Sequence, residues 1–449
     1  MKKEKKEKKQ PVKGKTVSEE KEVIIVTTSS GSEYYDEDAP VKAEKAEEKE
    51  EKKSSSKTAK AKAKAKMGEK VSKLISSRRI VLGSICVLLV AVIVSVLWVN
   101  RYNLSPTHIS NWFQTKLLGI GIGDGYPVEL TGSNAKVGNF FSYDGNCAVL
   151  SDTVLTVHNA TGDETVSVRH SYNNPSMDEA SGRFVIYNQG AEGYSVYSPE
   201  KGTEKFTANF GVAVADIADN GRYSVVTYPD DYASVMDVYN LDHELIYTYK
   251  FADGYVTAMS LRDDGYMAAV ATVYTNNGEL YSKISVLDLS KTSPVAEYVM
   301  NGDLVTSVHW GGSCVYAVGD TKLSVSDSSY NFTDYEYEGK QLTAVFSKGN
   351  KMYVSISGYS YAGASTLLIF DRSAEPLTVD IADRITDISA SGSVVAVLAG
   401  DMVHSFDSLS GVELGDAQSG SDAHAIAMVN ESSCYVLGAK EIRCVSLEK

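Results

Sequence analysis

The chain has 449 residues and a formal net charge of −14, with 44 Lys and Arg against 58 Asp and Glu. This length accommodates two or three ordinary domains, but the charge is spread so unevenly that one uniform domain is excluded. Residues 1–101 contain 24 Lys and Arg against 15 Asp and Glu, whereas residues 102–449 contain 20 against 43, so the two parts are expected to occupy different environments.

The first segment, residues 1–77, consists mostly of Lys, Glu, Ser and Ala and includes the run AKAKAKAK at 59–66. Such a chain cannot bury enough apolar surface to offset the entropy that it would lose on ordering. The composition predicts a disordered tail, whose basic end would contact anionic lipid head groups and help to set the membrane topology.

A single transmembrane helix is predicted within residues 78–101. The run IVLGSICVLLVAVIVSVLW, residues 80–98, carries no charge and at about 1.5 Å per residue nearly spans a hydrocarbon core of about 30 Å. A cleaved signal peptide is disfavoured because a long segment precedes the run. Basic residues concentrate before the helix, which favours a cytoplasmic N-terminus and an extracytoplasmic remainder.

Residues 102–125 follow as a linker with a short amphipathic helix. Ser105 is a candidate N-cap and Pro106 fits the first helical position, while Ile109, Trp112 and Phe113 lie on one stripe. This helix would either lie on the outer leaflet or pack against the following domain, and packing is the simpler expectation.

From residue 126 to 449 the sequence consists of short strand-like runs separated by turn residues. One phrase, a turn followed by an apolar strand, recurs about every 40 residues. Its eight copies place the turn at Gly145, Gly182, Gly221, Gly265, Gly312, Gly349, Gly392 and Ser433. The pattern predicts an all-β fold, an eight-bladed β-propeller. Seven blades is the alternative, if one copy is irregular.

The two ends of the repeat support eight blades. The last copy stops one strand short, whereas YPVEL, residues 126–130, is a spare strand before the first copy. We therefore expect YPVEL to complete the last blade and close the ring.

The phrase SYDGNCAVLSDTVLTVHNATG resembles WD40, YVTN and quinoprotein-like repeats, although most copies lack the Trp-Asp dipeptide. The plan of charged tail, single anchor, GIGDGYPVEL and Tyr-rich repeats also resembles an uncharacterised family of membrane-anchored propeller proteins from Gram-positive bacteria. This resemblance implies a propeller and a membrane location, and it brings no assigned activity.

Copies three, four and six carry extra residues between their second and third strands, in the loop that opens on the face of the blade-to-blade links. Asn277-Gly278 predicts a type I′ turn that pairs Tyr274 with Tyr281 in a hairpin over residues 271–282. We interpret these additions as a binding rim, because Tyr offers contact area at low entropic cost. The rim residues are Tyr228, Asp230, Asp231, Tyr232, Tyr274, Asn276, Asn277, Tyr281, Tyr359 and Tyr361. Alternatively, the loops simply vary in length and Tyr is a good strand residue.

The sequence gives little support for a disulfide, a metal site, a catalytic nucleophile or a quinone cofactor. Cys434 and Cys444 could form a disulfide across a hairpin with a three-residue loop at 438–440, although a two-residue turn would offset the pair. The scattered histidines match no metal motif, no G-x-S-x-G nucleophile elbow is present, and no tryptophan docking pattern suggests a quinone cofactor. We expect no catalytic residue, no metal, no cofactor and no nucleic acid partner.

The sequence therefore predicts a single-pass membrane protein whose extracytoplasmic propeller binds a cell-surface protein or a wall polymer without catalysis. Two alternatives remain. One is a polysaccharide hydrolase or lyase with carboxylates at the ring centre, and the other is a sensor that couples the propeller to the cytoplasmic tail.

Overall fold

The computed structural model describes residues 85–92, 94 and 121–447, which fall in two separate units. Residues 85–92 are helical with exposed side chains. Within the described residues, no helix has both the length and the apolar character that a membrane span requires. The predicted tail and juxtamembrane helix, and much of the predicted span, lie outside the described residues.

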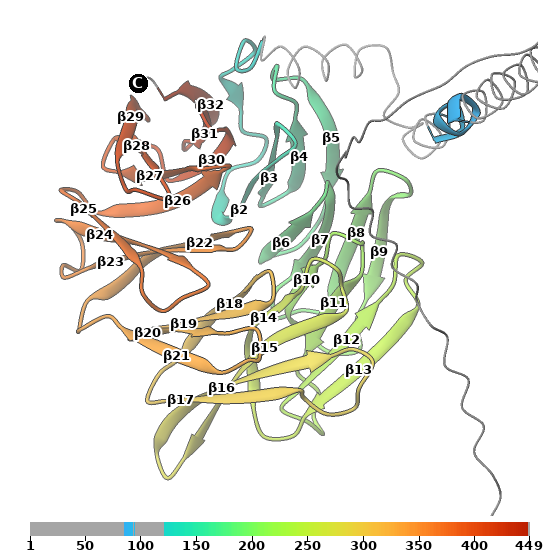
Figure 1. The fold of residues 1–449 in the computed structure, drawn as a ribbon. Helices are drawn as coiled ribbons and strands as arrows, with labels where there is room; N and C mark the ends of the chain where they lie inside the picture. The colour runs from blue at the N-terminus through green and yellow to red at the C-terminus, as the bar shows by residue number, and fades with distance from the viewer. Residues whose placement is uncertain (1–84, 93, 95–120, 448–449) are drawn as a thin grey trace, which may run out of the picture. The chain divides into compact units, whose positions relative to one another are not determined.

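Residues 121–447 form eight four-stranded antiparallel sheets arranged as the blades of a ring (Figure 1). The predicted eight-bladed propeller is confirmed. The first strand of each blade contacts the first strands of its neighbours, so these strands line the inside of the ring. Each blade occupies the stretch of sequence around one copy of the recurrent phrase.

The strands of the first four blades follow the repeat. Blade one contains β2 (Ala135–Tyr143), β3 (Asn146–Ser151), β4 (Val154–His158) and β5 (Glu164–Arg169). Blade two contains β6 (Pro175–Ala180), β7 (Arg183–Asn188), β8 (Gly193–Ser198) and β9 (Gly202–Thr207). Blade three contains β10 (Val212–Ile217), β11 (Tyr223–Thr227), β12 (Ser234–Tyr239) and β13 (Leu245–Phe251). Blade four contains β14 (Tyr255–Leu261), β15 (Met267–Asn276), β16 (Glu279–Asp288) and β17 (Ala296–Asn301).

The remaining blades complete the ring in the same order. Blade five contains β18 (Val305–Gly311), β19 (Cys314–Gly319), β20 (Lys322–Ser326) and β21 (Phe332–Glu336). Blade six contains β22 (Gln341–Lys348), β23 (Lys351–Ser357), β24 (Ser365–Asp371) and β25 (Leu377–Ile381). Blade seven contains β26 (Ile385–Ser391), β27 (Val394–Ala399), β28 (Met402–Asp407) and β29 (Glu413–Gln418). Blade eight contains β30 (Ala425–Asn430), β31 (Ser433–Leu437), β32 (Glu441–Ser446) and, as its outer strand, β1 (Val128–Glu129).

The expected closing strand is confirmed. Val128 pairs with Ile442 and Glu129 with Glu441, in antiparallel register. The Leu130 amide donates to the Lys440 carbonyl at 2.8 Å. The last blade thus takes its outer strand from the start of the repeat region, which leaves no gap between the first and last copies.

The recurrent glycines are explained by the backbone conformation of the turns. Gly145 has φ +82 and follows Asp144, which has φ 50. Two consecutive positive φ values are typical of a type I′ hairpin turn, and they match the right-handed twist of the flanking strands. Glycine adopts such a conformation without the steric cost that a Cβ atom imposes.

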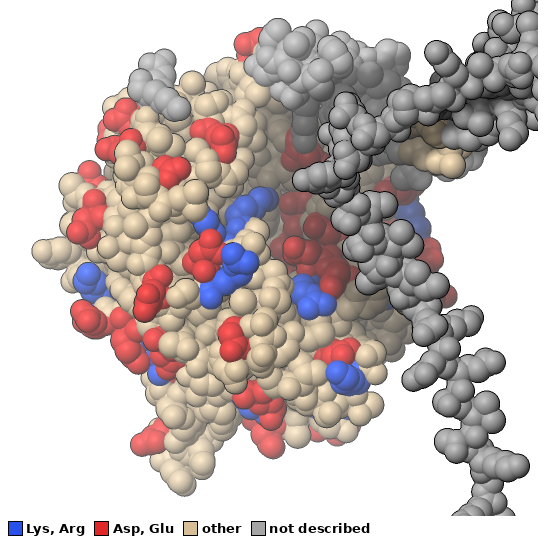
Figure 2. All heavy atoms as spheres, in the orientation of Figure 1, with Lys and Arg blue, Asp and Glu red and all other residues tan. Residues whose placement is uncertain are grey.

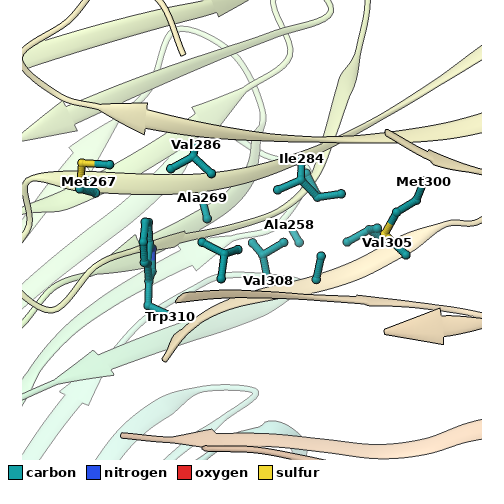
Figure 3. Packing of buried hydrophobic residues seen from close by; sticks show 12 residues of the cluster. Ala258, Met267, Ala269, Ile284, Val286, Met300, Val305, Val308 and Trp310 are labelled. Carbon is teal, nitrogen blue, oxygen red and sulfur yellow. The ribbon is translucent and has the colours of Figure 1, made fainter. Parts of the chain in front are cut away.

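The core lies between neighbouring blades. Figure 3 shows the contact between blades four and five, where Met267, Ile284 and Val286 face Val308 and Trp310. Burying a large apolar side chain contributes about 1.5–3 kcal/mol. Each blade covers one face of the next, so no single blade is expected to be stable without its neighbours.

A buried serine at the third strand recurs as a link between blades. The Oγ atoms of Ser234, Ser282 and Ser365 accept hydrogen bonds from the first or second amides of the next inner strand, at 2.9, 3.0 and 3.0 Å. These bonds fix where each following blade begins.

The possible disulfide between Cys434 and Cys444 is not formed, since both are free thiols. Cys434 lies opposite Val445, and Cys444 lies opposite Tyr435. The one-residue offset places the two sulfur atoms on opposite faces of the sheet. The registers of β31 and β32 therefore exclude the bond.

Candidate functional site

The rim residues lie in three loops, between β11 and β12, β15 and β16, and β23 and β24. Because the strands of a blade alternate in direction, these loops open on the same face as the links between blades. Blades three and four are adjacent. Blade five separates them from blade six, and its corresponding turn consists only of residues 320–321.

Tyr228 meets a tyrosine that sequence reasoning missed. Its ring packs edge-on against Tyr255 with the centroids 5.6 Å apart, and its hydroxyl donates to the Val256 carbonyl at 2.7 Å. Tyr228 belongs to blade three, whereas Tyr255 is the first residue of β14 in blade four. The rings remain 43% and 57% exposed. The contact therefore fixes two exposed rings at the seam between two blades.

The rest of the blade-three loop combines a ring with carboxylates. The Lys250 Nζ lies 4.7 Å from the centroid of the Tyr232 ring, an arrangement typical of a cation–π interaction. Tyr232, Asp230 and Asp231 are all exposed. This loop thus presents two carboxylates beside a ring that already contacts one cation.

The predicted hairpin in blade four is present. Tyr274 pairs with Tyr281, and their rings stack with centroids 5.5 Å apart. Asn277 and Gly278 have φ 53 and φ +87, as the type I′ turn requires. The hairpin projects from the ring at the lower edge of the view (Figure 1).

The hairpin tip has mixed exposure. Asn276, Asn277 and Glu279 are exposed, while the two stacked tyrosines are half-buried. The Tyr281 hydroxyl donates to Glu279 Oε2 at 2.8 Å, and this bond raises the pKa of Tyr281. The tip therefore offers amide and carboxylate groups more readily than ring faces.

The blade-six loop stands apart. Tyr359 and Tyr361 are 60% and 95% exposed. The Tyr359 ring packs over Gly363, where a Cβ atom would approach Tyr359 Cδ2 to 2.7 Å, and the Arg384 guanidinium donates to the Tyr359 carbonyl. Of the predicted rim, the loops of blades three and four belong to adjacent blades, whereas the loop of blade six is separated from them by blade five. We call Tyr228, Tyr232 and Tyr255 the tyrosine seam.

Carboxylates also converge on the inner strands, which the sequence prediction did not identify. Asp178 on β6 lies close to Asp216 on β10, since its Oδ2 accepts the amide of Ile217, the residue that follows Asp216. Burial raises the pKa of both carboxyls, and the neighbouring charge of Asp178 raises the pKa of Asp216 further. The sequence signal was a single acidic residue inside an apolar strand, as in VADIA at residues 214–218.

A third inner-strand carboxylate is Asp387 on β26. Its Oδ2 accepts the Ile426 amide at 2.7 Å, and burial raises its pKa to about 7. Asp178 and Asp216 accept amides of following blades in the same way, at 2.9 and 2.7 Å. Hydrogen bonding to the next blade thus accounts for the position of all three carboxylates.

Acidic side chains outnumber basic ones in residues 102–449, 43 against 20. Figure 2 shows Asp and Glu side chains scattered over the visible face among mostly uncharged residues, with several Lys and Arg near its middle. No group of three or more His, Cys, Asp or Glu side chains in the described part of the chain is arranged to hold a metal ion. The rim residues described above offer a ligand aromatic rings and carboxylate groups.

Comparisons with known proteins give a family without an assigned activity. A family model described as a family of unknown function, DUF5711, matches residues 124–447. A search of curated proteins gives no match. Among solved structures, the computationally designed Ika8 protein has 12% identity and a TM-score of 0.51, and the match covers 71% of this chain and 100% of that chain. BamB from Moraxella catarrhalis has 13% identity and a TM-score of 0.47, over 72% of this chain and 98% of that chain. At these identities the likeness concerns the fold alone. The family match covers the whole propeller, and the chain belongs to DUF5711, a family of unknown function.

Proposed function

We propose that the protein is a membrane-anchored, extracytoplasmic binding module whose propeller holds a positively charged segment of a partner protein at the tyrosine seam. The observation that carries the proposal is the fixed contact of Tyr228 with Tyr255, two exposed rings held together across the junction of blades three and four. A wall polymer is the other class of ligand, and the binding experiment below distinguishes it from a cationic protein segment.

The rigidity of the seam supports a binding role. Tyr228 is held both by its ring contact and by its hydrogen bond to Val256. Side chains that are already ordered lose less conformational entropy when a partner binds. Exposed Tyr is also enriched where proteins bind other proteins. The seam thus combines contact area with a low entropic cost.

Charge favours a cationic partner over a neutral one. Asp230 and Asp231 are exposed beside the seam, and Glu279 is exposed at the hairpin tip. Lys250 already occupies a cation–π position on Tyr232. A Lys or Arg side chain from a partner would find equivalent ring faces with carboxylates nearby.

The membrane location rests on the uncharged run at residues 80–98 and on the basic residues that precede it. Protease added to intact cells with a permeabilised wall should digest the propeller and spare an epitope at the N-terminus. Loss of the N-terminal epitope instead would reverse the proposed orientation.

The binding experiment uses the purified full chain and three probes: a synthetic peptide of alternating Lys and Ser, its Glu counterpart, and purified wall polysaccharide. Tyr255→Ala should weaken binding of the Lys peptide about thirtyfold, as expected for an aromatic hot spot worth about 2 kcal/mol. Increasing salt should also weaken this binding, because the contact is exposed and charged.

Tyr266→Ala is the matched control. Tyr266 is 57% exposed, as Tyr255 is, and Arg222 lies 4.3 Å from its ring centroid, but it precedes β15 on the opposite face of the blade. Its removal should leave the affinity unchanged. Equal binding of the Lys and Glu peptides, or loss of polysaccharide binding alone in Tyr255→Ala, would contradict a cationic protein partner.

A further inference from the structure

The inner strands of blades two, three and four are joined by consecutive carboxylate contacts. Asp178 on β6 accepts the Ile217 amide of blade three at 2.9 Å, and Asp216 on β10 accepts the Leu261 amide of blade four at 2.7 Å. Each inner strand ends its sheet, so one edge of its backbone has no neighbouring strand in that sheet. The two carboxylates satisfy amides on this edge, and they do so in series across three blades.

The two carboxyl groups also lie close together, because Asp178 Oδ2 accepts the amide of Ile217, the residue that follows Asp216. The two groups influence each other's pKa, and a hydrogen bond between two carboxyl groups requires a proton on one of them. If both were ionised, two negative charges would meet in a partly buried site with little water to screen them. Both residues keep partial exposure, so this proton can exchange with solvent.

We propose that Asp178 and Asp216 share one proton, and that this proton fastens blades two, three and four together at their inner strands, so that its loss loosens this sector of the ring. The tyrosine seam lies in the same sector, at the junction of blades three and four. The proposal concerns the fold of the sector and does not depend on which partner the seam binds.

The surroundings make the second ionisation unfavourable. Glu179 on β6 lies beside Asp178, and burial raises its pKa to about 7. Asp263, which follows β14, interacts with Asp216, and burial raises the pKa of Asp263. Tyr187 on β7 interacts with both carboxyls. A positive charge, Lys348 at the end of β22, interacts with Glu179 and Asp263.

The direction of the pH effect follows from proton binding. In the unfolded chain both aspartates have a pKa of about 3.9. In the folded chain the pair keeps a proton to higher pH, so the folded state binds more protons than the unfolded state. Stability is therefore greatest on the acidic side and falls as pH rises above about 4, by about tenfold in the folding equilibrium for each pH unit while the proton remains bound.

The test is urea unfolding of the full chain from about pH 5 to about pH 9. Asp216→Asn keeps an oxygen to accept the Leu261 amide and a donor for Asp178, but it removes the second charge. Between about pH 5 and about pH 9, the folding equilibrium constant of the wild type should fall by a factor at least ten times larger than that of Asp216→Asn. An unchanged pH dependence would overturn the proposal.

Asp387→Asn is the matched variant, because Asp387 also accepts an inner-strand amide from the next blade. Asp387→Asn should remove only the part of the pH dependence of stability that comes from Asp387. The larger loss of stability at high pH, which comes from the Asp178–Asp216 pair, should remain. If Asp387→Asn abolished the whole effect, the pair would not be its source.

A second measurement needs no variant. Infrared spectra of the unaltered full chain should retain a protonated-carboxyl band above the pKa values of about 7 of Glu179 and Asp387. Disappearance of all such bands once these two groups ionise would show that the pair holds no shared proton, and this outcome would also overturn the proposal.

Discussion

The hydroxyl of Tyr435 donates a hydrogen bond of 2.7 Å to the carbonyl of Gly145, across 290 residues of sequence. Tyr435 lies in the last blade and Gly145 in the first turn of the first blade. The Tyr126 ring also packs against Tyr435, with the centroids 5.0 Å apart. The ring is therefore closed by side-chain contacts as well as by the pairing of β1 with β32.

Tyr435→Phe should weaken this closure without disturbing the packing. It removes the bond to Gly145 and leaves the partly buried carbonyl without that donor, so we expect the free energy of unfolding to fall by about 1–2 kcal/mol. Chemical denaturation measures the change. Tyr361→Phe is the control, because Tyr361 is 95% exposed and should leave stability unchanged. Equal stability of Tyr435→Phe and wild type would show that the bond does not contribute to closure.

The hairpin of blade four should tolerate loss of its aromatic pair. Replacing Tyr274 and Tyr281 together by Ala should cost about 1 kcal/mol, because the rings are half-buried and stack on each other. Ser282→Ala should cost more, since the Ser282 Oγ donates to Asp303 and accepts from Val305 at the link to blade five. Thermal unfolding compares the losses of stability in the two variants. A larger loss in the tyrosine variant would mean that the tip supports the fold.

Only part of the predicted hairpin at residues 271–282 is a surface loop. Ala271 is fully buried in the core between blades four and five, and Ser282 is fully buried as well. The segment 271–282 is therefore not wholly a surface insertion, and only its outer part can be shortened without opening the core.

The pH dependence of stability should respond to Asp387. Burial raises the pKa of Asp387 to about 7 in the folded chain, above the value of about 3.9 in the unfolded chain. Its contribution is therefore present at acidic pH and is lost as pH rises through about 7. Asp387→Asn should flatten this part of the curve, by about 4 kcal/mol or less at mildly alkaline pH.

Asp380→Asn serves as the control for that curve, because Asp380 is exposed on the outer strand β25 and accepts the Thr366 hydroxyl at 3.0 Å. Its stability curve should run parallel to that of the wild type. If Asp380→Asn flattened the curve as much as Asp387→Asn does, burial of Asp387 would not be the cause.

The propeller thiols should be unreactive in the native state. Burial raises the pKa of Cys147 and of Cys434, and it raises the pKa of Cys444 to about 11. Iodoacetamide should therefore modify them slowly at neutral pH and completely after unfolding in urea. Mass spectrometry counts the adducts. A native mass lower by two hydrogens, restored by a reductant, would reveal a disulfide that the strand register excludes.

The sequence was sufficient to predict the ring because its features repeat. Positive-φ turns favour glycine, so Gly145 and its six equivalents mark blades one to seven, whereas blade eight has Ser433 at this position. The spare strand at Val128 could be recognised because the last copy lacks an outer strand. The Tyr274–Tyr281 pair followed from local turn geometry.

Contacts between blades could not be predicted in the same way. Tyr255 contacts Tyr228 because the link from β13 to β14 ends beside the loop between β11 and β12. The distance between these two segments cannot be read from a single sequence. Asp178 and Asp216 lie in neighbouring copies, but their meeting depends on the angle between two inner strands. The offset of Cys434 and Cys444 depended on one residue of register, which the short hairpin between them left open.

The binding role of the tyrosine seam can be tested most directly by hydroxyl-radical footprinting of the full chain with and without the alternating Lys and Ser peptide. Bound peptide should protect Tyr228, Tyr232 and Tyr255 from oxidation, while Tyr266, on the opposite face and as exposed as Tyr255, should oxidise at the same rate with and without peptide. Protection of Tyr266 to the same extent, or no protection of the seam at saturating peptide, would contradict the assignment.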